Sequence, residues 1–108
     1  MANKRLVSKR HTKRLPVIFS NGDSEFAGTT SNLSSTGLFI RTRKALNPGT
    51  LLKIVLEVDK DKKINLEGEV AWSLKTGLAD FKNGMGVKLK DIPQAYEELI
   101  KEARSRSL

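Results

Sequence analysis

The chain has 108 residues, of which 38% are hydrophobic and 30% charged, as expected for one globular domain with a modest core. Cysteine is absent, so disulfides, thiolate nucleophiles and cysteine-based metal sites are excluded, and the length leaves little room for a separate catalytic lobe. The net charge is +8, and six basic residues without an acid lie in residues 1–14. This excess indicates an anionic partner or a solvated tail.

The N-terminal segment, residues 1–14, is basic and has almost no apolar periodicity. We therefore predict a basic arm that stays mobile until a ligand orders it. No apolar signal-peptide core follows the basic start, and no run approaches the roughly 18 apolar residues of a membrane span. The sequence thus predicts a cytoplasmic protein without membrane insertion.

Short strands are predicted after the arm, over residues 15–90. An apolar run at residues 15–19 ends at the turn-forming pair Asn21-Gly22. Residues 25–33, rich in Thr and Ser, lead to a polar corner, and residues 37–42 form the next strand.

The clearest hairpin combines residues 52–58 with residues 64–72, where apolar and polar side chains alternate with the two-residue period of a strand. A charged turn, residues 59–62, joins the two strands. A glycine-containing loop then precedes the last predicted strand, residues 85–89. Together the strands indicate an all-β domain in the form of a small antiparallel barrel.

The pattern changes to a helix at the C-terminus, residues 91–108. Asp91 as an acidic cap, Pro93 and Gln94 are typical of a helix start. One apolar helical face follows, made by Tyr96, Leu99, Ile100 and Ala103. We expect this face to close one end of the barrel.

Groups suited to catalysis are scarce. His11 is the single histidine and lies among the cations of the basic arm, with no cysteine or second histidine to act with it. Gly84-Met85-Gly86 enters a strand rather than a helix, so we interpret it as a tight turn and not as a phosphate-binding loop. Trp72 continues the inward-facing alternation of its strand, which favours a core position over a base-stacking surface. The sequence therefore predicts that the protein is not an enzyme and holds no metal or cofactor.

Two short motifs carry the functional information. The first is Arg10-His11-Thr12-Lys13-Arg14, an Arg-x-x-x-Arg just before the first strand. The second is Asn32-Leu33-Ser34-Ser35-Thr36-Gly37, an Asn-x-Ser-x-x-Gly that alone would be typical of an ordinary turn. In this order and at this separation the two motifs resemble the signature of the PilZ domain family. The resemblance covers roughly residues 10–90.

This resemblance implies an all-β fold: a six-stranded antiparallel PilZ-type β-barrel with a C-terminal α-helix and a mobile basic N-terminal arm. It also implies that the barrel binds cyclic di-GMP, a bacterial second messenger, without turning it over. The implied ligand-binding residues are Arg10, Arg14, Asn32, Ser34 and Gly37, with Lys9 beside them.

These residue types suit the ligand. The planar fork of arginine meets guanine O6 and N7 in a bidentate way and also pairs with phosphate. In this family the residue at the position of Lys9 influences whether one ligand or a stacked pair binds, and a cation there favours two. Gly37 allows a positive φ and a close approach of the backbone to the ligand.

Asn32 departs from the aspartate that many relatives carry. A carboxylate accepts hydrogen bonds from both guanine N1–H and N2–H, whereas the amide has one accepting oxygen. We therefore expect the affinity for cyclic di-GMP to be lower than with aspartate.

The predicted function is a receptor whose N-terminal arm orders over cyclic di-GMP and passes the signal to an unidentified downstream protein. Motility and biofilm control are the processes that the resemblance implies. Two alternatives stay open: a PilZ-like protein-interaction adaptor without ligand, and a basic nucleic-acid-binding β-barrel. The low content of aromatic residues weighs against nucleic acid, because single-strand binders stack bases on aromatic side chains.

Overall fold

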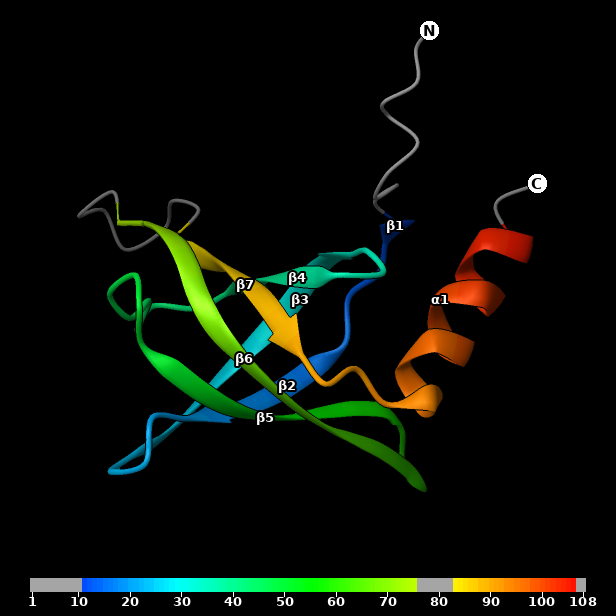
Figure 1. Cartoon of the computed structure of the whole chain (residues 1–108), viewed down its shortest axis with the longest axis horizontal. Coiled ribbons are helices and arrows are strands. Elements are labelled where there is room, and N and C mark those ends of the chain that lie inside the picture. The colour runs from blue at the N-terminus through cyan, green and yellow to red at the C-terminus, as the bar shows by residue number, and fades with distance from the viewer. Residues whose placement is uncertain (1–10, 76–82, 107–108) are drawn as a thin grey trace, which may run out of the picture.

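The computed structural model describes residues 11–75 and 83–106, which form seven strands and one helix. The strands are β1 (His11–Thr12), β2 (Pro16–Ser20), β3 (Glu25–Leu33), β4 (Gly37–Arg41), β5 (Leu51–Asp59), β6 (Lys62–Leu74) and β7 (Gly84–Lys90), and the helix is α1 (Gln94–Arg106). Figure 1 shows the strands wrapped into one body with α1 beside them.

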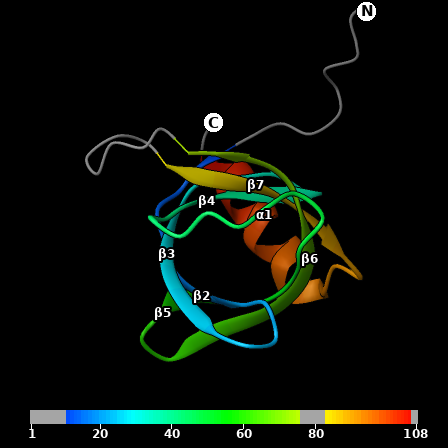
Figure 2. The same ribbon diagram turned by 90° about the vertical axis from the view of Figure 1, so that its left-hand side faces the viewer.

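Six of the strands close into an antiparallel barrel. Their order is β3-β2-β5-β6-β7-β4, and β4 pairs back with β3 to complete the ring. Figure 2 looks along the barrel, with α1 across its far end. The predicted six-stranded antiparallel barrel with a C-terminal helix is confirmed. Of the described residues, no helix combines the length and the apolar character needed to cross a membrane.

The core comes from the inward face of each strand, as the alternation predicts. In the β5–β6 hairpin, Leu52, Ile54 and Leu56 are buried and lie opposite Gly68, Leu66 and Ile64. Phe19 on β2 and Ile40 on β4 are also fully buried. Helix α1 adds a buried face whose members are Tyr96, Leu99 and Ile100.

The helix begins later than the sequence predicts. Asp91 has a φ of 46° and lies between the end of β7 and the helix, which starts at Gln94. The Pro93 carbonyl accepts hydrogen bonds from the N–H groups of Tyr96 and Glu97, so Pro93 stands just before the first turn. A left-handed backbone at Asp91 redirects the chain, and that conformation cannot be part of an α-helix.

β1 is a strand that the sequence does not predict. His11 pairs with Leu33 and Thr12 with Asn32, along the edge of β3 that β2 leaves uncovered. The side chain of Thr30 ties down the intervening chain: its Oγ1 donates to the Lys13 carbonyl at 2.6 Å and accepts from the Leu15 N–H at 2.9 Å. The last residues of the expected free arm are therefore attached to the barrel, because β3 offers them unpaired backbone groups.

The expectation that Trp72 lies in the core is wrong. Val70 pairs with Val87, but Trp72 pairs with Gly86, so Ala71 forms a β-bulge in β6. The extra residue reverses which side chains face inward, and Trp72 is 44% exposed. Its ring stacks on Phe39, with centroids 5.2 Å apart and planes at 27°.

Candidate functional site

A pocket lies on the outer wall of the barrel, between the β3–β4 turn and the strands β6 and β7. Its volume is about 240 Å³, below the roughly 300–1,000 Å³ typical of small-molecule sites. The lining residues come from β3, β4, β6, β7 and the turn: Asn32, Ser34, Thr36, Gly37, Leu38, Phe39, Ala71, Trp72, Gly86, Val87 and Lys88. The described residues therefore form an open site that would enclose only part of a dinucleotide.

The Asn-x-Ser-x-x-Gly motif forms one wall of this pocket. Asn32 is the second-last residue of β3 and lies opposite Phe39 on β4 and Thr12 on β1. Ser34 and Gly37 follow in the turn and at the start of β4. The structure thus brings together three of the six predicted ligand residues, Asn32, Ser34 and Gly37.

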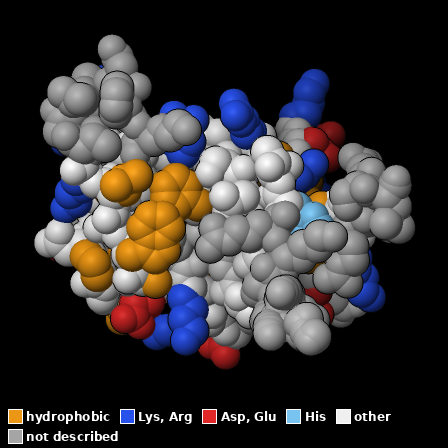
Figure 3. Space-filling view, turned by 90° about the horizontal axis from the view of Figure 1, so that it is seen from above, with side chains coloured by type: hydrophobic (Ala, Val, Ile, Leu, Met, Phe, Trp, Pro, Cys, Tyr) orange, Lys and Arg blue, Asp and Glu red, His pale blue; other side chains and the backbone are white. Residues whose placement is uncertain are grey.

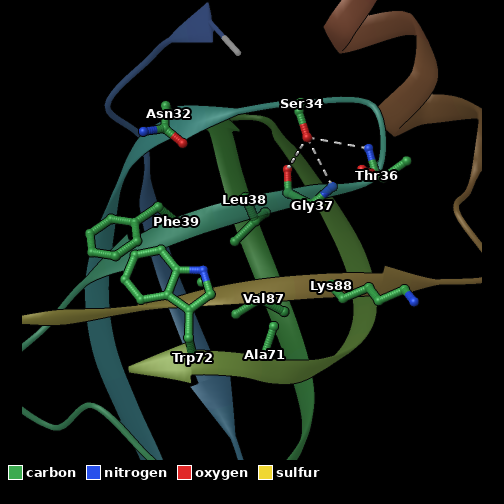
Figure 4. Close-up of a pocket in the computed structure, with 11 residues that line it drawn as sticks. Asn32, Ser34, Thr36, Gly37, Leu38, Phe39, Ala71, Trp72, Val87 and Lys88 are labelled. Atoms are coloured by element: carbon green, nitrogen blue, oxygen red, sulfur yellow. Dashed lines mark hydrogen bonds between the residues drawn. The ribbon is translucent and has the colours of Figure 1, made fainter. Parts of the chain in front are cut away.

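The hydroxyl of Ser34 shapes the turn itself (Figure 4). Its Oγ accepts hydrogen bonds from the N–H groups of Gly37 at 3.2 Å and Thr36 at 3.4 Å, and donates to the Gly37 carbonyl at 3.3 Å. The Ser34 N–H donates to the same carbonyl at 2.9 Å. Ser34 is only 8% exposed, so its side chain fixes where the pocket wall stands.

Gly37 is needed for a different reason from the one predicted. Among the described glycines only Gly22 and Gly49 have positive φ, so the expected left-handed conformation at Gly37 is wrong. A Cβ at Gly37 would collide with the backbone carbonyl oxygen of Val87 on β7. The close approach at this glycine is therefore to the neighbouring strand.

The Arg-x-x-x-Arg motif meets the second motif through β1. Thr12 on β1 pairs with Asn32 on β3, so the middle of the first motif lies beside the strand that carries the first residue of the second motif. Arg14 is exposed, between β1 and β2, and is not among the residues that line the pocket. Lys9 and Arg10 lie outside the described residues.

His11 is buried rather than exposed on an arm. It is 7% exposed, and its Nε2 has no hydrogen-bond partner among the described residues. Within residues 11–75 and 83–106, no three His, Asp or Glu side chains are grouped so as to hold a metal ion. The described residues that line the pocket include no His, Asp or Glu.

Sequence reasoning missed the aromatic part of the site. Figure 4 shows the rings of Phe39 and Trp72 side by side at one end of the pocket. Viewed from above, hydrophobic side chains gather on one part of the surface, and lysine and arginine side chains lie around it (Figure 3). These two rings provide an accessible apolar surface next to the polar wall at Asn32.

Two glycines in β7 make room for these rings. A Cβ at Gly84 would collide with the Phe39 ring, and one at Gly86 would collide with the Trp72 indole. The prediction of a tight turn here is wrong, because Gly84 and Gly86 lie inside β7 and are buried. Glycine inside a strand often marks a close approach, and this signal could have located the aromatic pair.

The fold and pocket define a small antiparallel barrel with a polar and aromatic site on its outer wall. The family model described as PilZ domain matches residues 4–103, which include both motifs. The chain therefore belongs to the PilZ domain family. No curated protein matches it by sequence.

Three solved structures resemble this chain in fold. Their sequence identities are low, so the likeness concerns the fold alone. The Bacillus subtilis inhibitor of motility (MotI/DgrA) has a TM-score of 0.78 at 17% identity; the match covers 97% of this chain and 52% of that one, about half its length. The PilZ domain with c-di-GMP of YcgR from Escherichia coli has a TM-score of 0.70 at 11% identity, covering 96% and 98%. The PilZ domain of CeSA from a cellulose-synthesizing bacterium has a TM-score of 0.61 at 20% identity, covering 94% and 100%.

Proposed function

We propose that this PilZ domain is a cytoplasmic receptor that binds cyclic di-GMP in the pocket beside the β3–β4 turn. The observation that carries the proposal is the pairing of Thr12 with Asn32, which attaches the Arg-x-x-x-Arg segment to the pocket wall. We infer from this pairing that two motifs separate in the sequence belong to one binding site. Membership of the PilZ family supports the same assignment.

The chemistry of the pocket suits a guanine base. Asn32 offers an amide that hydrogen-bonds to a base edge, and the Phe39–Trp72 pair offers an apolar surface for stacking. The described pocket has one lining cation, Lys88, whereas the ligand carries two phosphates. Arg10 and Arg14 would supply the remaining positive charge, and their bidentate hydrogen bonds fit both guanine and phosphate.

The arm is proposed to transmit the signal. Residues 1–10 continue directly from β1, and ligand contacts of Lys9 and Arg10 would order them over the pocket. That ordering changes the charged surface and hence what a downstream protein can dock onto. Because Lys9 offers a cation to a second guanine, we propose two ligand molecules per chain.

The relatives suggest where such a signal goes. YcgR provides a PilZ domain seen with c-di-GMP, and MotI is an inhibitor of motility. We propose by analogy that this protein acts in motility or biofilm control, without catalysis, through a protein partner.

Calorimetric titration with cyclic di-GMP tests the assignment. We expect wild type to bind in the micromolar range or tighter, and Arg10→Ala and Arg14→Ala to weaken binding by about tenfold or more, since a charged hydrogen bond contributes about 1.5–3 kcal/mol. Lys60→Ala is the matched control: it removes one charge from the exposed β5–β6 turn and should leave Kd unchanged. Absence of heat with wild type at tens of micromolar ligand would refute the assignment.

One observation favours a second candidate, single-stranded nucleic acid. The scarcity of surface aromatics argued against it, yet Trp72 is exposed and stacked on Phe39. A titration with a random oligonucleotide at two salt concentrations decides between the candidates. Steeply salt-dependent binding, together with no response to cyclic di-GMP, would favour nucleic acid.

A further inference from the structure

Helix α1 contacts the turn that forms one wall of the pocket. Tyr96, on the first turn of the helix, directs its hydroxyl to the Ser34 carbonyl at 2.8 Å and the Gly37 carbonyl at 3.1 Å. These partners lie 62 and 59 residues away in the sequence. A phenol has one proton, so the hydroxyl donates mainly to Ser34, the nearer carbonyl.

Tyr96 is a firmly held donor. It is 0% exposed and is the largest fully buried side chain among the described residues. Burial raises the pKa of Tyr96 well above its usual value. The phenol therefore keeps its proton over the whole range of neutral pH, and the hydrogen bond stays made.

The turn is fixed from two sides. On the side of the barrel, the Leu89 N–H donates to the Thr36 carbonyl at 2.9 Å, and the backbone of Gly37 lies against Val87. On the other side stands Tyr96. The same turn lines the pocket. Two contacts therefore act on one short piece of backbone: helix α1 through Tyr96, and any ligand that the pocket holds.

We propose that Tyr96 is a positioning residue that holds the Ser34–Gly37 turn in its ligand-binding shape and couples the occupied pocket to the docking of helix α1. This inference rests on the proposed function. Coupling free energies act in both directions: a helix that steadies the turn favours the ligand, and a ligand that steadies the turn favours the docked helix. The C-terminal helix thereby becomes a second element, besides the arm, that responds to cyclic di-GMP.

The variant Tyr96→Phe keeps the buried ring and removes only the hydroxyl. We expect it to weaken cyclic di-GMP binding by about three- to tenfold, the range for one neutral hydrogen bond. Ile100→Val is the matched control, because it trims a buried side chain of the same helix and leaves the hydroxyl in place. Its Kd should stay within about twofold of wild type.

Amide hydrogen exchange distinguishes coupling from a purely structural role, because a purely structural role predicts no change of the helix amides when the ligand binds. Without ligand, Tyr96→Phe should speed exchange of the Ser34 and Gly37 amides, while Ile100→Val leaves them slow. Saturating cyclic di-GMP should slow exchange of the Leu99 and Ile100 amides in wild type. In Tyr96→Phe, the same saturation should leave those helix amides unchanged.

The outcomes separate this inference from the proposed function. If wild type binds but its helix amides do not respond, or if Ile100→Val loses as much affinity as Tyr96→Phe, the coupling is refuted and the receptor assignment stands. If wild type binds no cyclic di-GMP, the receptor assignment and the coupling to ligand both fail. The exchange of the turn amides without ligand then still decides whether Tyr96 holds the turn.

Discussion

Asn32 and Ser34 lie two residues apart, but their side chains serve different parts of the site. Ser34 directs its hydroxyl into the turn, where it bonds to backbone groups of Gly37 and Thr36. Asn32 is half-buried at the end of β3 and lines the pocket. Ser34 therefore sets the shape of the wall, and Asn32 presents a polar side chain to the pocket.

Replacing Asn32 by aspartate tests the chemistry of the wall. Asn32→Asp provides two accepting oxygens for the N1–H and N2–H of guanine, so we expect Kd for cyclic di-GMP to fall by about tenfold. Calorimetry measures the change. Asn65→Asp, on the exposed face of β6, alters the net charge equally and should leave Kd unchanged. Equal effects of the two substitutions would mean that Asn32 does not contact guanine.

Replacing Ser34 by alanine tests the shape of the wall. Ser34→Ala leaves the N–H groups of Thr36 and Gly37 without their acceptor, and we expect the free energy of unfolding to fall by about 1–2 kcal/mol. Ser35→Ala, at the exposed neighbouring position, should change it by less than about 0.5 kcal/mol. Urea unfolding curves measure both. A Ser34 variant as stable as the Ser35 variant would contradict this role.

Among the described elements, β1 is the shortest strand, and one side chain of β3 holds the chain that follows it. Thr30 is 0% exposed, and its hydroxyl bonds to backbone groups of both Lys13 and Leu15. This side chain joins β1 to β2 across the short gap between them. A buried hydroxyl in β3 therefore holds residues 13–15, which include Arg14, against the barrel.

Thr30→Val tests this attachment, because valine keeps the shape and removes the hydroxyl. We expect the free energy of unfolding to fall by about 2 kcal/mol, since buried backbone groups lose their partner. Affinity for cyclic di-GMP should fall as well, because the first motif is no longer held beside Asn32. Thr29→Val, on the exposed side of the same strand, is the control in unfolding and titration. Unchanged binding by Thr30→Val would show that β1 does not position the ligand residues.

The strands and the helix could be predicted because each carries a periodic pattern. In residues 52–58 and 64–72 every second residue is apolar or glycine, and the structure pairs the two strands in one register from Leu51 to Glu57. The pattern failed where the backbone departs from regularity. The bulge at Ala71 turned Trp72 outward, and nothing in the side-chain alternation marks an inserted residue.

The site was predictable where it is local and was missed where it depends on distant contacts. Asn32, Ser34 and Gly37 lie within six residues of one another, so a turn brings them together. The pair Phe39–Trp72 and the contact of Tyr96 with Ser34 join residues far apart in the chain. These contacts form because the barrel closes in a particular way, and no short sequence motif predicts that closure.

For the molecule as a whole, the buried phenol predicts how stability varies with pH. The pKa of Tyr96 is raised in the folded protein from its usual value of 10.0. Above about pH 10 the unfolded chain releases this proton and the folded chain keeps it, so stability falls as pH rises. Below about pH 10 the buried phenol of Tyr96 makes its full contribution to the free energy of unfolding.

A comparison of wild type with Tyr96→Phe isolates this effect, because the other titrating groups are common to both proteins. The difference in unfolding free energy should shrink by up to about 1.4 kcal/mol per pH unit above about pH 10. Urea unfolding from about pH 8 to about pH 11 measures it. A constant difference over that range would mean that the phenol is not buried as described.

The pairing of β1 with β3 has a consequence for how the barrel behaves in solution. Residues 31–33 lie beside β4 on one edge, and in the described part of the chain residues 11–13 cover their other edge. A chain shortened by its first 14 residues would expose a row of unpaired N–H and C=O groups beside the pocket, and such a row recruits a strand from a neighbouring molecule. Light scattering should therefore show that the shortened chain self-associates, because β1 no longer covers this edge of β3.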